Sequence, residues 1–397
     1  MWKWLAAAIA GAALASAQPS AVAPAPAPAA FPKWSLQYFH DEDRTELRIT
    51  GFAFPSTERG VAVGVIYDRA GRSRPQPTAL VTRDGGVQWT PVALKEFPRS
   101  IFFLNESQGW LVTPNAIWAT EESGRSWTRI ADQIKPNGKL EGSVEGGLIL
   151  RVWFLDAMHG FAVGLQKSVF ETTDGGRTWV PVPEAAKPQA NPGLSVYSQI
   201  AFTGGRLGII TGGYIPRRPG DELPDWMMPE ELLNRRQVPA LTLQLATSNG
   251  GGSWTSSTAP LLGSVAALKL AGSSGLVVFQ YADSFEWPSE VFRIDLGTGK
   301  SESAFRQKDR GVTDAALFPG GGGMLAAVEP VGNLRSAPIP GKVRMLASTD
   351  LKSWTEMNVD YRAVARSVML AGPDAEHMWA ATDTGMILKL TPAPAAP

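Results

Sequence analysis

The sequence predicts an all-β protein, a seven-bladed β-propeller with four-stranded blades. Three observations carry this prediction: a recurrent Asp-Gly-Trp turn phrase, apolar strand-like segments ahead of each copy, and matching partial units at the two ends of the chain. All 397 residues need not form several small domains, because a closed array of repeats builds one domain from neighbouring units.

The turn phrase reads Ser or Thr, then Asp two positions on, then Gly and Trp. Its clearest copies are 82–89, 172–179 and 247–254, and worn copies occupy 120–127 and 348–354. Asp or Asn accepts backbone N–H bonds in a turn, Gly takes the positive φ, and Trp enters the next strand with its ring in the core. We therefore expect a hairpin at each copy. Its structural residues are Asp84, Trp89, Glu122, Trp127, Asp174, Trp179, Asn249, Trp254, Asp350 and Trp354.

Repeated aspartates could instead be catalytic or bind metal. One residue type at equivalent places in every repeat is what an architecture needs, whereas a single active site does not need it. His40, His159 and His377 are isolated in sequence, and there is neither a His-Glu-x-x-His motif nor a carboxylate cluster at metal spacing. We therefore predict no catalytic residues, no metal and no cofactor.

The repeated unit is strand, strand, strand, turn and Trp-led strand. The predicted units are 51–92, 101–130, 152–179, 200–256, a degenerate 266–303, and 314–359. The stretch 368–390 supplies only three strands, and 34–39 is a Trp-led strand without a unit of its own. If the two pair, the N-terminal strand completes the last blade and closes the ring, which removes exposed sheet edges. Six or eight blades remain alternatives because one unit is degenerate.

Both ends of the chain are expected to lie outside the propeller domain, 33–390. Residues 1–17 have the charged start, short apolar run and small-residue cleavage site of a signal peptide, with an uncleaved anchor as the alternative. An Ala/Pro linker, 18–32, follows, and 391–397 is a similar disordered tail. We expect an exported periplasmic protein, or a thylakoid-lumen protein if the source is a phototroph, with no membrane span after signal cleavage.

The charge balance and the absence of cysteine narrow the classes of function. Lys and Arg together number 37, as do Asp and Glu, and neutrality argues against nucleic acid as the main partner. The chain has no cysteine, which excludes thiol catalysis, disulfides and a lipid-modified N-terminus. We expect a monomer that binds a protein partner. A membrane-protein complex is one candidate for that partner.

The phrase Ser/Thr-x-Asp-x-Gly-x-x-Trp resembles the Asp-box, or bacterial neuraminidase repeat. With Gly-Phe-Ala-Val-Gly at 160–164 ahead of 172–179, the chain resembles the photosystem II assembly and stability factor family, whose relatives also occur in bacteria without photosystems. The resemblance covers the folded body. It implies a noncatalytic propeller scaffold that binds a protein partner and assists the assembly or stabilisation of a membrane complex.

Asp-boxes also occur in sialidases and other glycosidases, so a sialidase-like glycoside hydrolase or a glycan-binding propeller is the alternative. A sialidase needs an arginine triad, an acidic general acid, and a Tyr nucleophile assisted by Glu. The nearest match to its Arg-Ile-Pro signature is Arg293-Ile294, which lies late in the chain and lacks the Pro. We interpret Arg293 as an outward strand residue.

The loops between the second and third strands of each unit carry the insertions. The largest is 214–240, in which Pro229, the following glutamates and the late arginines predict a short helix. Arg with Trp, Tyr and Met is the composition of a binding hot spot. Alternatively, the apolar residues pack the insertion onto the propeller and the arginines are solvated. The candidate partner-binding residues are Arg69, Arg72, Arg74, Arg217, Arg218, Trp226, Arg235, Arg236, Tyr281, Trp287 and Arg335.

Overall fold

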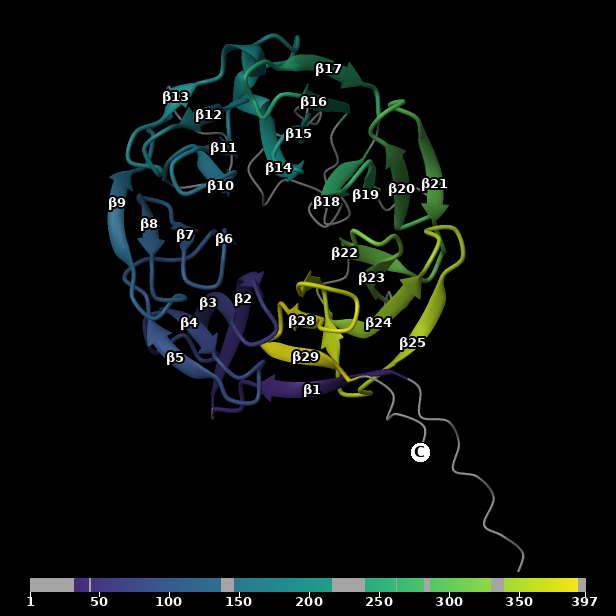
Figure 1. Cartoon of the computed structure of the whole chain (residues 1–397). Helices are drawn as coiled ribbons and strands as arrows, with labels where there is room; N and C mark the ends of the chain where they lie inside the picture. Colours follow the sequence, from purple (N-terminus) through teal and green to yellow (C-terminus); the bar gives the residue numbers. More distant parts are fainter. Residues whose placement is uncertain are drawn as a thin grey trace, which may run out of the picture.

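The protein is an all-β propeller whose sheets are arranged around a central axis (Figure 1). This computed structural model describes residues 32–42, 44–136, 146–215, 240–261, 263–281, 286–329 and 339–391. The expected signal peptide, nearly all of the Ala/Pro linker, most of the 214–240 insertion and nearly all of the tail lie outside these residues.

Five of the sheets have four antiparallel strands each, in sequence order from the axis outward. The first has β2 (Thr45–Ala53), β3 (Gly60–Asp68), β4 (Gln76–Thr82) and β5 (Thr90–Ala93). The second has β6 (Ser100–Phe103), β7 (Gly109–Val112), β8 (Ala116–Thr120) and β9 (Thr128–Asp132). The third has β10 (Ile149–Phe154), β11 (Gly160–Gly164), β12 (Val169–Thr172) and β13 (Val180–Pro181). The fourth has β14 (Ser195–Thr203), β15 (Leu207–Tyr214), β16 (Leu241–Thr247) and β17 (Thr255–Ala259). The fifth has β18 (Ser264–Ala271), β19 (Ser274–Gln280), β20 (Ser289–Asp295) and β21 (Ser301–Phe305).

The sixth sheet has nine strands and contains both ends of the folded chain. Its order is β22 (Gly311–Leu317), β23 (Gly323–Val328), β24 (Gly341–Ser348), β25 (Thr355–Val359), β1 (Lys33–Phe39), β29 (Met386–Thr391), β28 (Trp379–Thr382) and β27 (Val368–Ala371), with β26 (Val364–Ala365) on β24. Two short 3₁₀ helices, η1 (Pro183–Ala186) and η2 (Pro192–Leu194), join β13 to β14.

The nine-stranded sheet corrects the sequence prediction of a propeller with seven four-stranded blades. That prediction is wrong, because the described residues form five four-stranded blades and one larger, continuous sheet. The cause is β1. It pairs antiparallel with β29, from Lys33 opposite Thr391 to Phe39 opposite Met386, and it also pairs parallel with β25 through Lys33 and Trp34. One N-terminal strand therefore bonds on both of its edges and fuses what were expected to be separate blades.

The turn phrase forms tight hairpins closed by its own side chains. In the β4–β5 turn, the Asp84 carboxylate accepts the Gln88 N–H at 2.9 Å, and the Thr82 hydroxyl accepts the Gly86 N–H at 2.9 Å. Gly85 and Gly86 have φ of 67° and 87°, a region that a side chain with a Cβ resists. These hydrogen bonds lie within the turn itself, so the turn geometry does not depend on contacts with the rest of the ring.

Tryptophan side chains of neighbouring sheets donate hydrogen bonds to two of these turns. Trp379 is fully buried, stacks on Phe54 with ring centroids 3.8 Å apart, and donates its Nε1–H to the Gly85 carbonyl at 3.1 Å. Trp110 stacks on Phe154 at 3.6 Å and, in the same way, donates to the Gly175 carbonyl. A buried indole needs a partner for its N–H, and here the turn backbone supplies it. The turns thus bond one sheet to the next.

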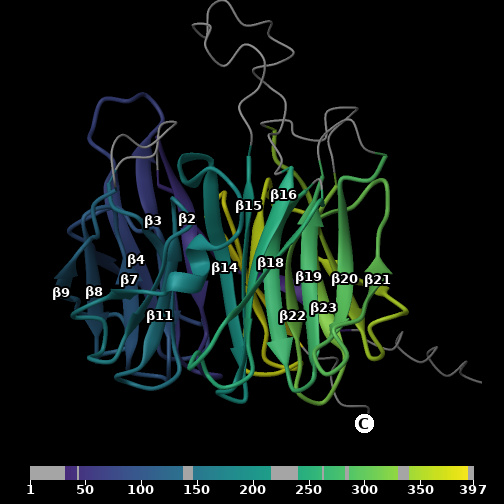
Figure 2. The ribbon, with the colours of Figure 1, turned by 90° about the horizontal axis from the view of Figure 1, so that it is seen from above.

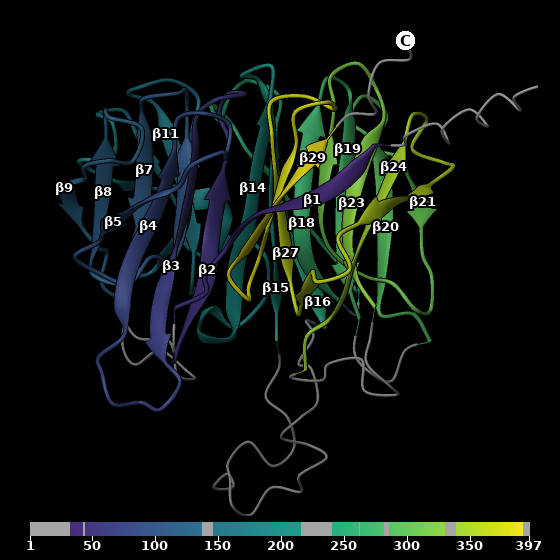
Figure 3. The same cartoon turned by 90° about the horizontal axis from the view of Figure 1, so that it is seen from below.

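Two faces of the ring follow from this topology. The hairpin face carries the turns between third and fourth strands, including β4–β5, β12–β13, β16–β17 and β20–β21. The loop face carries the connections between second and third strands, including β3–β4 and β19–β20. Figures 2 and 3 show the ring from the side, with the blue-purple β3–β4 loop extending well beyond the strand ends. Among the described residues, no helix has the length and apolar character to cross a membrane.

Candidate functional site

The β3–β4 loop holds three candidate arginines out into solvent. The Asp68 carboxylate at its base accepts the backbone N–H groups of Ala70, Arg72 and Ser73 at 2.9, 3.0 and 3.1 Å. These bonds, that of Ala70 foremost, lower the pKa of Asp68 and keep it ionised. The loop is thereby ordered at its start without using the arginine side chains. Those side chains, all exposed, belong to Arg69, Arg72 and Arg74.

None of these three arginines forms an ion pair within the part of the chain that the structure describes. A guanidinium that is exposed and unpaired keeps its full set of donors for a carboxylate or phosphate of another molecule. We call these residues the arginine loop.

A second group of candidates surrounds Trp287 near the β19–β20 connection. The Arg306 guanidinium lies 5.0 Å from the Trp287 ring centroid, and the Lys308 ammonium lies 5.7 Å from it. Arg306 also approaches Glu290 at 3.7 Å, and the Tyr281 hydroxyl donates to the same carboxylate at 3.0 Å. Burial, and then the hydrogen bond to Glu290, raise the pKa of Tyr281. We call this group the Trp287 cluster.

The structure brings only part of the predicted set together. Tyr281 and Trp287 share the Trp287 cluster, whereas the arginine loop leaves another sheet on a different side of the ring (Figure 1). The other candidates, Arg217, Arg218, Trp226, Arg235, Arg236 and Arg335, lie outside the described residues.

Sequence reasoning missed the two cations of the Trp287 cluster. Arg306 and Lys308 lie in the connection from β21 to β22, which returns to the face from which the β19–β20 connection also leaves. A usable signal was present, because cations alternate at 306, 308 and 310 directly after a strand ends. Only the sheet topology shows that they meet Trp287.

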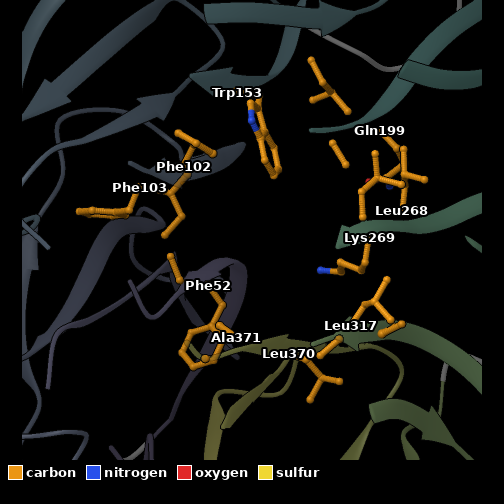
Figure 4. A pocket seen from close by; sticks show the side chains of 18 of the residues that line it. Phe52, Phe102, Phe103, Trp153, Gln199, Leu268, Lys269, Leu317, Leu370 and Ala371 are labelled. Carbon is orange, nitrogen blue, oxygen red and sulfur yellow. The ribbon is translucent and has the colours of Figure 1, made fainter. Parts of the chain in front are cut away.

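The central axis holds a cavity of about 390 Å³ formed by the innermost strands. Figure 4 shows its wall, where Phe52, Phe102 and Trp153 come from three different sheets and Lys269 points inward. The Phe102 and Trp153 rings lie 5.1 Å apart. The Lys269 ammonium is 3.1 Å from the Asp314 carboxylate across neighbouring strands. The cavity is therefore aromatic on one side and charged on the other.

Arg151 adds a positive charge to this cavity. The residue is exposed and lines the cavity, where desolvation by the surrounding protein lowers its pKa while the Asp314 charge acts in the opposite direction. Arg151 has no ion pair or hydrogen bond from its side chain within the described ranges. Since Lys269 and Asp314 offset each other, the cavity carries one net positive charge and suits an anionic group.

Two histidines and Arg293 are engaged in local pairs. His159 Nε2 lies 2.8 Å from Glu171, His377 Nδ1 lies 2.8 Å from Asp374, and Arg293 pairs with Glu302 at 3.1 Å. Among the residues that the structure describes, no three His, Cys, Asp or Glu side chains gather closely enough to hold a metal ion.

Fold and geometry define the class of protein: an all-β propeller with cationic and aromatic groups on its loop face and in its axis. No family model matches the chain, and a search of curated proteins finds no match. Solved structures do match. "YCF48 bound to D1 peptide" superposes with a TM-score of 0.56 at 16% identity, covering 92% of this chain and 97% of that chain. YCF48 from Cyanidioschyzon merolae gives 0.55 at 16%, covering 90% and 98%. Sqt1 from Saccharomyces cerevisiae gives 0.52 at 10%, covering 92% and 99%. At these identities the likeness is one of fold.

Proposed function

We propose that this protein is a noncatalytic, exported propeller that binds a protein partner through its loop face. The observation that carries the proposal is the arginine loop, whose backbone extends beyond the strand ends (Figure 3) and whose three arginines are exposed without an ion-pair partner among the described residues. Arg and Trp are the residues on which binding energy at protein interfaces concentrates. The Trp287 cluster provides a second contact region on the same face, in which a tryptophan ring lies against two cations.

The chemistry of this face favours an acidic partner segment. The arginine loop offers bidentate donors for carboxylates, and although the charge of Arg72 acts on Asp68, none of its arginines forms an ion pair among the described residues. In the Trp287 cluster the cations are partly neutralised by Glu290 and by Glu286, which pairs with Lys308. We therefore expect the arginine loop to contribute most of the attraction and the Trp287 cluster to contribute apolar contact.

We propose further that the partner belongs to a membrane complex whose assembly or stability this protein assists, in the periplasm or an equivalent exported compartment. Two considerations support this: the signal-like residues 1–17, and the fold shared with YCF48, one structure of which is bound to a D1 peptide. The D1 peptide is bound to YCF48. The partner of this chain is to be identified by experiment.

The test is cross-linking of the full chain in its native compartment, followed by identification of the attached protein. We expect the R69A/R72A/R74A variant to lose most of the cross-linked product while unfolding at the wild-type temperature. The matched control is R83A/R125A/R177A, which removes three exposed arginines from hairpin-face turns. Equal capture by both variants would contradict the loop face as the binding surface. Turnover of a fluorogenic sialoside or aryl glycoside by the purified chain would contradict a noncatalytic role.

A further inference from the structure

One hairpin of the propeller lacks the aromatic residue that the others share. In five hairpins the residue directly before the fourth strand is Trp, whereas in the β20–β21 hairpin it is Lys300, which precedes Ser301 at the start of β21. The five residues are Trp89, Trp127, Trp179, Trp254 and Trp354.

These indoles pack where one four-strand unit meets the next. Trp254, only 8% exposed, lies 5.4 Å from Phe161 on β11 of the preceding sheet and 5.9 Å from Phe202 of its own. Trp354 lies 6.2 Å from Phe305 on β21 and donates its Nε1–H to the Ala304 carbonyl at 3.0 Å. At these two hairpins the indole therefore fills the space between one sheet and the preceding one.

At the β20–β21 hairpin an apolar cleft of about 430 Å³ occupies the corresponding place, between β14–β17 and β18–β21. Gly299 and Ser301, the two neighbours of Lys300, both line this cleft, while the Lys300 side chain is exposed to solvent. The opposite wall includes Ile209, which follows Gly208 on β15 as Phe161 follows Gly160 on β11. This junction therefore lacks both the indole and a counterpart of the ring that Phe161 supplies to Trp254.

The cleft is apolar along most of its wall. Its side chains include Leu207 and Ile209 from one sheet and Val277, Phe292 and Leu296 from the other. Protein interiors are packed to crystal density, so a space of this size deprives its lining of the contacts that an indole supplies at the five other hairpins. An enclosed cavity lined by Leu, Ile and Phe binds small aromatic molecules, and this partly open cleft has walls of the same kind beside polar ones such as Thr211 and Gln244.

We propose that this cleft is a binding site for a small, planar aromatic molecule of indole size. The five equivalent hairpins supply the argument, because each places an indole where this junction has open apolar walls. The cleft is open to solvent at Leu261, a lining residue that is 44% exposed. The site is independent of the arginine loop, so it can be present or absent whatever the protein partner is.

The test uses free indole as the probe and the full chain as the receptor. Calorimetric titration is expected to show one saturable site, and the unfolding temperature should rise with indole concentration, since a ligand that binds only the folded state stabilises it. The Lys300→Trp variant is expected to unfold at a higher temperature than the wild type and to bind indole at least tenfold more weakly. The matched control is Lys352→Trp, which adds an exposed indole to the neighbouring β24–β25 hairpin without filling the cleft, and it should bind as the wild type does.

A second filling variant, Ala246→Phe on β16, covers the case in which Lys300→Trp fails to fold. Ala246 lines the cleft from the opposite sheet and is only partly exposed. We expect it to weaken indole binding at least tenfold as well. The absence of saturable binding to the wild type, or binding that survives both filling substitutions, would overturn the proposal.

Discussion

Both faces of the ring are built from strand-turn-strand connections, but the polar side chains of the two faces differ in what they bond to. On the hairpin face, the carboxylates of Asp84 and Asp174 are occupied by N–H groups of their own turns. On the loop face, the carboxylate of Asp68 also closes its own loop, but the arginines that follow it are left exposed and without ion pairs in the described structure. Side chains whose bonds are all made within the fold stabilise it, and those left unpaired are available to another molecule.

The largest expected effect separates two tryptophans. Trp379→Ala removes a fully buried indole that stacks on Phe54 and bonds to a turn carbonyl, and should lower the free energy of unfolding by about 3–5 kcal/mol. Trp287→Ala, on the loop face, should cost about 1 kcal/mol or less, because the ring is only partly buried under two cations. Urea denaturation of both variants measures the difference. Equal losses would contradict the division between the faces.

The next effect concerns two glycines with similar backbone angles. Gly251 in the β16–β17 turn has φ of 93°, and an added Cβ would overlap the Phe161 ring, so Gly251→Ala should cost about 2–3 kcal/mol. Gly205 in the β14–β15 turn has φ of 64° with open space around it, so Gly205→Ala should cost only the backbone strain, about 1 kcal/mol. Thermal unfolding ranks the two, and a reversed order would show that turn packing does not hold the sheets together.

A smaller effect, of opposite sign, is expected for the central cavity. Arg151→Met replaces a cation that is exposed to the cavity and has no ion pair within the described residues, so stability should rise by less than about 1 kcal/mol, because solvent screens an exposed charge. If the cavity receives an anionic group of the partner, the same variant should bind that partner more weakly. Denaturation and partner titration measured on one preparation give both readings. A loss of stability would mean that Arg151 serves the fold.

The smallest effect is the pH dependence that Asp174 contributes on the hairpin face. Hydrogen bonds from the Thr178 hydroxyl and backbone N–H lower the pKa of Asp174 from 3.8 to about 2. Because the folded-state pKa is the lower one, the stabilisation is present above about pH 4 and is lost as the pH falls toward 2. Asp174→Asn should flatten the stability profile in that window. Asn249 occupies the same place in the β16–β17 turn, so Asn249→Asp should steepen the profile, and an unchanged profile in both variants would refute the assignment.

Local parts of the fold could be predicted from the sequence because their causes are local. The hairpins follow from Asp, Gly and Trp within eight residues, and their glycines at 85, 86, 175 and 176 adopt positive φ. The worn copies show the limit of that reasoning, since Ser123 and Leu351 adopt φ of 58° and 59° without being glycine. Leu351 is nearly buried, so tertiary packing sustains a backbone angle that its residue type disfavours.

Long-range pairing could not be predicted in the same way. The parallel contact of β1 with β25 joins residues more than three hundred positions apart over only two registered pairs, and two pairs leave no periodic signature in the sequence. Arg151 was hidden for a related reason: it alternates with apolar residues on β10, and only the closed ring shows that this side of the strand faces a cavity. Composition alone predicted Trp287 as a candidate. The two cations that lie over its ring, Arg306 and Lys308, come from the β21–β22 connection and were not predicted.

The most direct test of the account is the affinity of the cross-linked partner for three proteins: the wild type, R69A/R72A/R74A and R83A/R125A/R177A. Both variants lose the same charge, one from the loop face and one from the hairpin face, so net charge is controlled. We predict a loss of at least tenfold for the loop-face variant, reduced at high salt as expected for exposed charges, and a change within twofold for the hairpin-face variant. Equal losses in the two variants, or a larger loss on the hairpin face, would contradict the loop face as the site of binding.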